Sequence, residues 1–330
     1  MREKRTGRTG EPYEPATTTT TTPDPATGPA TAVRRRSRTR TRTYALGLGA
    51  ALLATGTLTA CDDTTGAETK GAPAKKPAVV WDRSPGSIAA VGDSITRGFD
   101  ACVVLSDCPE VSWATGTDAA VQSLALRLLG EPAAISQRTW NYARTGAKVA
   151  ELPAQMARSA KHRPDLVTVL VGANDACADT AEEMTPVADF RASFTTALRD
   201  LRRAAPTTQV YVSSVPDLKR LWQTGRDNPL SRQIWKLGIC ASMLSEPQDV
   251  SAKAGARRTS VQNRVVAYNA VLKDVCGKDP RCRYDGGAVF DYRFDDEQLS
   301  RWDWFHPNKN GQGELAEIAY RNITAARAPR

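Results

Sequence analysis

The stretch Ser87-Ile88-Ala89-Ala90-Val91-Gly92-Asp93-Ser94 runs a short apolar segment directly into a turn. An uninterrupted apolar run is typical of a parallel strand that is covered on both faces. A glycine just after a strand permits a sharp turn that a β-carbon would hinder. The serine can then be the first residue of the next element, with its hydroxyl accessible at the turn and not packed in the core. Gly, Asp and Ser are also ordinary turn residues, so the tripeptide alone fits either interpretation.

Comparable apolar runs recur along the chain and alternate with helical patterns. The further strand candidates are Trp140–Ala143, Leu166–Val171, Val210–Val215 and Ala288–Tyr292. Five strands alternating with helices predict a doubly wound, three-layer α/β sandwich with a mainly parallel, flavodoxin-like sheet. In such sheets, functional residues gather at the carboxyl ends of the strands. Ser94 lies just past the first strand.

For two helices between these strands, the sequence predicts further detail: the two ends of one and the buried face of the other. Asp118 is the expected cap of a helix that ends at Gly130. Another helix has one apolar face, made of Phe190, Phe194, Ala197, Leu198 and Leu201. The stretches "VQNRVVAYNAVLKDVC" and "GELAEIAYRNI" show the same periodicity.

The first 80 residues have the composition of a targeting region. Residues 1–33 are rich in Thr, Pro and Ala and cannot bury a core, and a translation start at Val33 would explain this unusual tail. Residues 34–61 combine a basic segment with sixteen uncharged residues, as in a secretory signal, and sixteen is short of the roughly 20 that span a membrane. Residues 62–80 resemble a flexible linker, and we expect one folded domain over 81–330.

The signal ends in Leu58-Thr59-Ala60-Cys61, which resembles the bacterial lipobox. The resemblance implies that Cys61 is lipidated and becomes the mature N-terminus. We therefore expect an exported protein, held by a lipid anchor on the outer face of the cytoplasmic membrane or secreted.

The net charge of +9 belongs mostly to this targeting region. Residues 1–60 hold ten Lys/Arg and four Asp/Glu, which leaves about +3 for residues 61–330. A nucleic-acid-binding protein would carry a basic face on its folded domain. We expect no nucleic-acid partner.

Six cysteines remain if Cys61 carries lipid, and an even number in an exported chain suggests disulfides. Of the fifteen possible pairings, the spacing favours Cys102–Cys108 and Cys276–Cys282, which leaves Cys177–Cys240. Widely separated cysteines without a nearby histidine make a poor metal site. We expect neither a metal nor another cofactor.

Four segments at strand ends or before the last helix carry groups suited to acyl transfer. They contribute Ser94, Gly146 of "NYARTGAKV", Gly172 and Asn174 of "TVLVGANDAC", and Asp303 and His306 of "DWFHPNKNGQGELA". A serine hydroxyl needs an imidazole to take its proton, and the imidazole needs an acid to orient it. Backbone N–H groups and an amide can stabilise the oxyanion.

These four blocks, in this order, resemble the SGNH hydrolases, also called GDSL lipases and esterases. The resemblance covers residues 85–325. It implies that Ser94 is the nucleophile, His306 the base and Asp303 its orienting acid. The oxyanion donors would be the N–H groups of Ser94 and Gly146 and the Asn174 amide. Asp295 and Asp296 are alternative acids.

A finer resemblance is to the phospholipase B-like branch, carried by "VSWATGT", "ELPAQMARSAK", "GANDAC" and "SVPDLKRLW". In that branch the cysteine after the Asn-Asp pair is disulfide-bonded, which suits Cys177. The run Ile95–Phe99 departs from the usual apolar and small residues. We expect residues 218–260 to form a lid or rim, for which the family offers no assignment.

The expected function is an exported, monomeric serine ester hydrolase that works through an acyl-enzyme on lipid or phospholipid esters. The alternative within this chemistry is a carbohydrate O-acetylesterase. A non-catalytic binding lipoprotein on this fold would have lost Ser94, His306 or Asn174, and all three are present.

Overall fold

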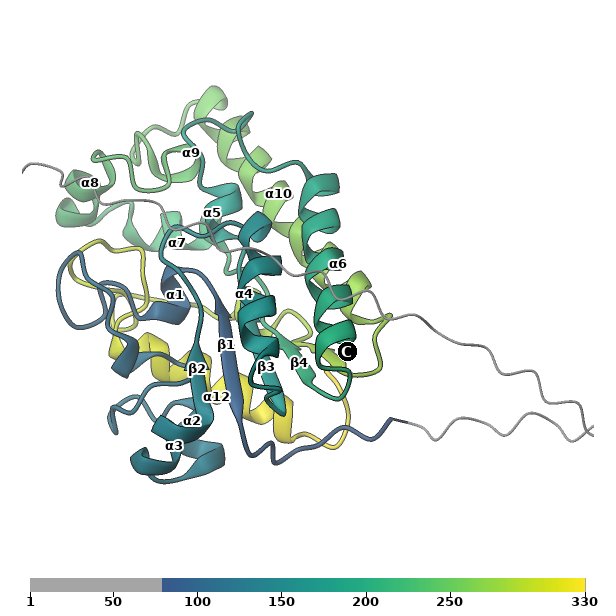
Figure 1. Ribbon diagram of the computed structural model, residues 1–330. Helices are drawn as coiled ribbons and strands as arrows, with labels where there is room; N and C mark the ends of the chain where they lie inside the picture. Colours follow the sequence, from purple (N-terminus) through teal and green to yellow (C-terminus); the bar gives the residue numbers. More distant parts are fainter. Residues whose placement is uncertain (1–78, 330) are drawn as a thin grey trace, which may run out of the picture. The chain divides into compact units, whose positions relative to one another are not determined.

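The computed structural model describes residues 79–329, which are built around five parallel strands in the order β2-β1-β3-β4-β5 (Figure 1). The strands are β1 Ile88–Gly92, β2 Thr139–Asn141, β3 Leu166–Leu170, β4 Gln209–Val212 and β5 Cys282–Tyr284. The N-terminal tail, the signal segment, Cys61 and nearly all of the linker lie outside the described residues.

Strand β1 lies inside the sheet and is buried on both faces, as its apolar run predicts. Ile88 pairs with Thr139 of β2 on one side and with Leu166 of β3 on the other. Residues 88–91 are fully buried. The segment that follows β1 therefore emerges between the ends of two neighbouring strands.

Helices cover both faces of the sheet and complete three layers. The larger core cluster packs the helices α4 Leu152–Ala160, α6 Val187–Ala204 and α10 Ala252–Cys276 against one face. The second cluster packs α2 Leu124–Leu129, α3 Pro132–Arg138 and α12 Lys309–Thr324 against the other. The predicted doubly wound sandwich is confirmed.

Short helices connect these layers, and most of them lie at the carboxyl ends of the strands. They are α1 Ser94–Arg97, η1 Pro109–Val111, η2 Val149–Glu151, α5 Ala173–Ala176, α7 Leu218–Gly225, α8 Pro229–Trp235, α9 Ala241–Leu244 and α11 Ala288–Asp291. None of the helices in the described part combines the length and apolarity needed to cross a bilayer. Three disulfides join the pairs that the spacing favours: Cys102–Cys108, Cys177–Cys240 and Cys276–Cys282.

The predicted strand at Ala288–Tyr292 is wrong. The fifth strand is Cys282–Tyr284, and the apolar run forms the single-turn helix α11. Asp285 favours this turn because its Oδ2 accepts a hydrogen bond from the Val289 N–H at 3.0 Å. Gly287 precedes the turn with a φ of 93°, a conformation that suits glycine.

The predicted cap Asp118 is also wrong, although its helix ends at Gly130 as expected. Helix α2 begins at Leu124, and Ser123 caps it by accepting the Leu126 N–H at 3.1 Å. Asp118 instead accepts the Ala120 N–H in a local turn. The apolar face predicted for α6 is confirmed, because its five members are the buried residues of that helix.

Candidate active site

Ser94 is placed by the turn directly after β1. Gly92 has a φ of 144°, and a β-carbon there would lie 2.1 Å from the Leu170 carbonyl oxygen of the neighbouring strand. Only glycine therefore fits this position. Asp93 caps α1 by accepting the Ile95 N–H at 3.0 Å, and Ser94 is the first residue of that helix.

A continuous hydrogen-bonded chain links Ser94, His306 and Asp303. The Ser94 Oγ lies 2.7 Å from His306 Nε2, and His306 Nδ1 lies 2.5 Å from Asp303 Oδ2. The second carboxylate oxygen, Asp303 Oδ1, accepts the N–H groups of Phe305 and His306 at 2.9 and 3.0 Å. All three side chains are buried. The structure thus brings together the three residues that the motifs single out.

The rival residues lie in other surroundings. Asp295 Oδ1 accepts the Glu297 N–H in a local turn, whereas Asp303 occupies the position beside the imidazole. His162 stacks on the Trp140 ring at 4.2 Å, and its Nε2 lies 2.6 Å from the Tyr142 hydroxyl.

The Asp303 carboxylate is held in its charged form. Burial raises its pKa, but hydrogen bonds from the His306 ring and from the backbone, with attraction to the ring, outweigh burial and leave the pKa below its ordinary value. A carboxylate acceptor at Nδ1 places the ring proton on that nitrogen. Nε2 is then free to accept the proton of Ser94.

The predicted oxyanion donors lie at the ends of β1, β2 and β3. Within residues 79–329, the N–H groups of Ser94 and Gly146 have no hydrogen-bond acceptor. Gly146 has a φ of 79°, although a β-carbon there would meet no neighbour, so its backbone conformation alone favours glycine. The Asn174 amide donates to the Ala147 carbonyl at 3.1 Å, which joins the loops after β2 and β3. One amide hydrogen remains available.

This arrangement of serine, histidine and acid accompanies a match over most of the chain. Residues 88–319 match the family model of GDSL-like lipase/acylhydrolase. The chain belongs to this family. No curated protein matches the sequence.

Several solved structures are similar to this GDSL-like hydrolase. They include the lipase Lip_vut3 from a goat rumen metagenome (15% identity, TM-score 0.46, 74% of this chain and 98% of that one). The extracellular lipase of Streptomyces rimosus has 17% identity and a TM-score of 0.44, over 73% of this chain and 100% of its own. A family two carbohydrate esterase from Clostridium thermocellum has 15% identity and a TM-score of 0.43, over 72% of this chain and 62% of its own.

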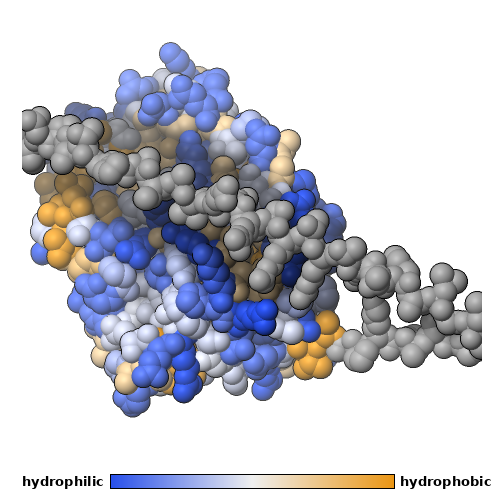
Figure 2. Space-filling view, in the orientation of Figure 1, coloured by the Kyte–Doolittle hydropathy of each residue, from blue (hydrophilic) through white to orange (hydrophobic). Residues whose placement is uncertain are grey.

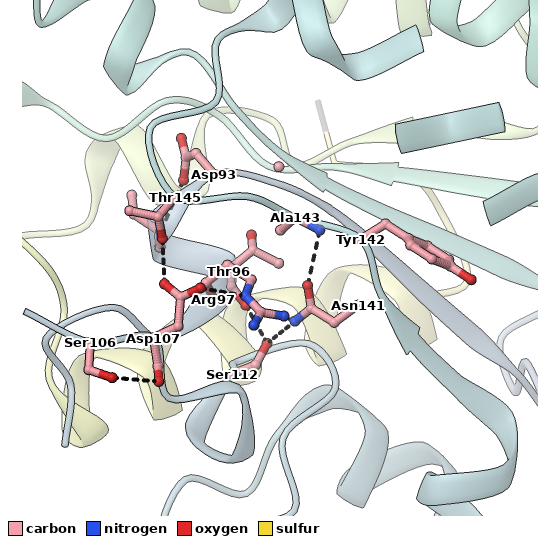
Figure 3. Close-up of polar contacts among 12 residues, drawn as sticks. Asp93, Thr96, Arg97, Ser106, Asp107, Ser112, Asn141, Tyr142, Ala143 and Thr145 are labelled. Atoms are coloured by element: carbon pink, nitrogen blue, oxygen red, sulfur yellow. Dashed lines mark hydrogen bonds and ion pairs between the residues drawn. The ribbon is translucent and has the colours of Figure 1, made fainter. Parts of the chain in front are cut away.

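A polar network fixes helix α1 of the GDSL-like hydrolase against the loop after β2 (Figure 3). Asp107 accepts from Arg97 Nε at 3.0 Å through one oxygen and from the Thr145 hydroxyl through the other. The Asn141 amide donates to the Thr96 carbonyl at 3.0 Å. Because α1 carries Ser94 and Thr145 precedes Gly146, the network sets the distance between two of the expected oxyanion donors.

Two further side chains support the site from distant elements, and the sequence motifs give no sign of either. Gln155 of α4 brackets Gly92, accepting its N–H at 2.7 Å and donating to its carbonyl at 3.0 Å. The buried Trp235 of α8 donates its indole N–H to the Asp303 carbonyl at 3.1 Å. Within residues 218–260, expected as a lid or rim, Trp235 therefore supports the loop that carries Asp303.

The motifs also give no sign of a second acid, Asp100. It is buried, and its carboxylate lies within 4.8 Å of ligand-type atoms of Asp303 and His306. Burial and the neighbouring Asp303 charge raise the pKa of Asp100 to about 6. The spacing of the three groups resembles a cation site, but His306 Nδ1 and Asp303 Oδ2 already use each other as partners.

Asp93, just before Ser94, and Asp175, just after Asn174, have structural roles. Burial raises the pKa of Asp93 to about 7, and its Oδ2 has no partner within the described residues. Burial also raises the pKa of Asp175, whose Oδ2 accepts the Val149 N–H at 2.9 Å.

Proposed function

We propose that this protein is a serine ester hydrolase that cleaves carboxylic esters through an acyl-enzyme on Ser94. The observation that carries the proposal is the buried chain of hydrogen bonds from Ser94 through His306 to Asp303. A serine in this setting is activated because the imidazole can take its proton while the carboxylate stabilises the resulting imidazolium.

The reaction follows from these positions. His306 Nε2 accepts the Ser94 proton as Oγ attacks the ester carbonyl, and the negative charge moves to the carbonyl oxygen. The free N–H groups of Ser94 and Gly146 and the Asn174 amide stabilise that oxyanion. His306 then returns the proton to the leaving alcohol. Water repeats the sequence on the acyl-enzyme and releases the carboxylic acid.

We further propose that the protein is exported and anchored through lipid on Cys61, and that lipid esters are its substrates. The sequence of residues 34–61 supports export and anchoring. A carbohydrate O-acetylesterase would use the same catalytic groups. The acyl chain and the alcohol of the preferred substrate therefore distinguish a lipid esterase from a carbohydrate esterase.

A panel of p-nitrophenyl esters from acetyl to palmitoyl, with Ser94→Ala as the control, tests the proposal. We expect hydrolysis that Ser94→Ala abolishes and a preference for longer chains. A preference for acetyl would favour the carbohydrate esterase, and equal hydrolysis by Ser94→Ala would contradict the proposed function.

A further inference from the structure

The loop between α1 and η1 exposes three consecutive aliphatic side chains. Val103, Val104 and Leu105 are between 48% and 79% exposed. In Figure 2 a hydrophobic patch lies at the left edge, where Figure 1 places this loop. Single exposed apolar residues are ordinary, but a contiguous group at a loop tip marks a surface that contacts a partner.

This loop is fixed rather than merely exposed. The Cys102–Cys108 disulfide closes it, and the Asp100 N–H donates to the Ser106 carbonyl at 3.0 Å. Leu105 has a φ of 53°, and its N–H donates to the Asp100 carboxylate. Glycine or asparagine would occupy this left-handed conformation at lower cost. The leucine therefore adds backbone strain to the cost of an exposed apolar side chain, which a turn without a further role would not need.

The same loop contacts the catalytic groups. The Phe99 ring meets the His306 ring edge-on, with 5.0 Å between centroids. Asp100, which holds the Leu105 N–H, lies beside Asp303 and His306. The Leu105 backbone is therefore tied, through Asp100, to the surroundings of Asp303 and His306.

Helix α8 and the turn just after it expose two more leucines, and the helix also contacts the site. Leu230 and Leu237 are 59% and 82% exposed, while Trp235 reaches the Asp303 carbonyl from the same helix. The segment 226–237 contains three basic residues and one acid: Arg226, Arg232, Lys236 and Asp227. Exposed aliphatic side chains next to basic ones are suited to an anionic lipid surface.

We propose that the tip Val103–Leu105 and the exposed Leu230 and Leu237, on α8 and just after it, form a lipid-docking surface. This surface seats the active site on an anionic lipid aggregate, so the ester is taken from aggregated lipid. The substrate class rests on the proposed function, whereas docking itself does not.

Binding is measured on the Ser94→Ala protein, so that no lipid is hydrolysed. The protein is sedimented with vesicles of equal parts phosphatidylglycerol and phosphatidylcholine, and with vesicles of phosphatidylcholine alone. We expect binding to the anionic vesicles that weakens with salt. Adding Val103→Ser, Val104→Ser and Leu105→Ser should lower the partition coefficient by about tenfold or more.

Two further variants separate docking from folding. Val266→Ser removes a valine of α10 that is 49% exposed, and it should leave vesicle binding unchanged. Leu105→Asn keeps a residue that accepts the left-handed backbone, so it should melt at or above the wild-type temperature and still bind vesicles more weakly.

In the active protein, the triple serine variant should lower the ratio of hydrolysis on vesicles to hydrolysis of a soluble monomeric ester. Three results would overturn the docking proposal: no vesicle binding by Ser94→Ala, equal binding by the triple variant, or a change from dimer to monomer caused by the triple variant. Vesicle binding without ester hydrolysis would instead contradict the proposed function and leave the docking surface standing.

Discussion

The Ser94 hydroxyl owes its position to the two residues before it. Gly92 allows the chain to pass the Leu170 carbonyl, and Asp93 caps the helix that Ser94 opens. The N-terminus of a helix also carries a partial positive charge, although α1 is only four residues long. The placement rests mainly on the turn and on the hydrogen bond to His306.

Asn174→Ala tests the amide as an oxyanion donor. The amide acts mainly in the transition state, so kcat should fall by about 10²–10³ with little change in KM. Steady-state kinetics on a soluble ester measure both quantities. Asn310→Ala, an exposed asparagine on α12, is the matched control and should behave as wild type. A change confined to KM would contradict the assignment.

Asp100→Asn tests the second acid as a residue that tunes the base. Burial and the Asp303 charge raise the pKa of Asp100 to about 6, so a negative charge forms beside Asp303 and His306 as the pH rises through that value. His306 must be neutral to accept the serine proton. Removing the charge should shift the acidic limb of kcat/KM to lower pH, on the order of one unit.

The same variant should change stability with a defined sign. Because the pKa of Asp100 is raised in the folded state, the folded protein binds more protons than the unfolded chain between about pH 4 and 6. This group therefore lowers stability as the pH rises through that window. Asp100→Asn should raise the free energy of unfolding more at pH 8 than at pH 4.

For the tuning role of Asp100, an unchanged pH–rate profile in Asp100→Asn would be the contradicting result.

At the scale of elements, the sequence pattern correctly predicted those features that depend on the element's own residues. The continuous apolar run of β1 and the single apolar face of α6 predicted their burial correctly. The prediction of a strand at Ala288–Tyr292 is wrong because a short apolar run fits either a strand or a buried helical turn, and the hydrogen bond from the Val289 N–H to Asp285 favours the turn. Ser123 displaced Asp118 as a cap because the helix begins later than its composition suggests.

The disulfides can be compared at this scale, since they close loops of different length. Cys177–Cys240 spans 63 residues and joins the end of α5, next to Asn174, to the start of α9. Replacing both cysteines by alanine should lower the free energy of unfolding by about 4 kcal/mol in the chain-entropy model. Cys276–Cys282 spans six residues, and its removal should lower it by roughly 2 kcal/mol. Denaturant unfolding measures both, and the reverse order would contradict the argument.

At the scale of the whole molecule, the motifs located the site but not its supports. Order along the chain and position at strand ends were enough to single out Ser94, Asp303 and His306, which the structure joins by hydrogen bonds. Gln155 and Trp235 lie 63 and 68 residues from the partners they hold. Their roles depend on how α4 and α8 pack, which spacing does not encode. The sequence did not predict the position of Asp100, because its loop folds back toward Asp303, which is distant along the chain.

Export is predicted from the sequence of the whole chain. Cys61→Ala removes the residue that would carry the lipid, and firm anchoring needs two or more acyl chains. The variant should therefore be released to the medium or remain unprocessed. Membrane fractionation and mass spectrometry of the N-terminus measure the outcome. Wild-type protein found wholly in the medium, with an N-terminus other than Cys61, would contradict the anchor.

The most direct test of the central claim is covalent labelling with a serine-directed fluorophosphonate, mapped by mass spectrometry. The account predicts one label per molecule, located on Ser94. Ser94→Ala should take up none, and His306→Ala should react orders of magnitude more slowly because nothing accepts the serine proton. A label on another residue, or equal labelling rates in wild type and His306→Ala, would contradict the assignment of Ser94 as a nucleophile activated by His306.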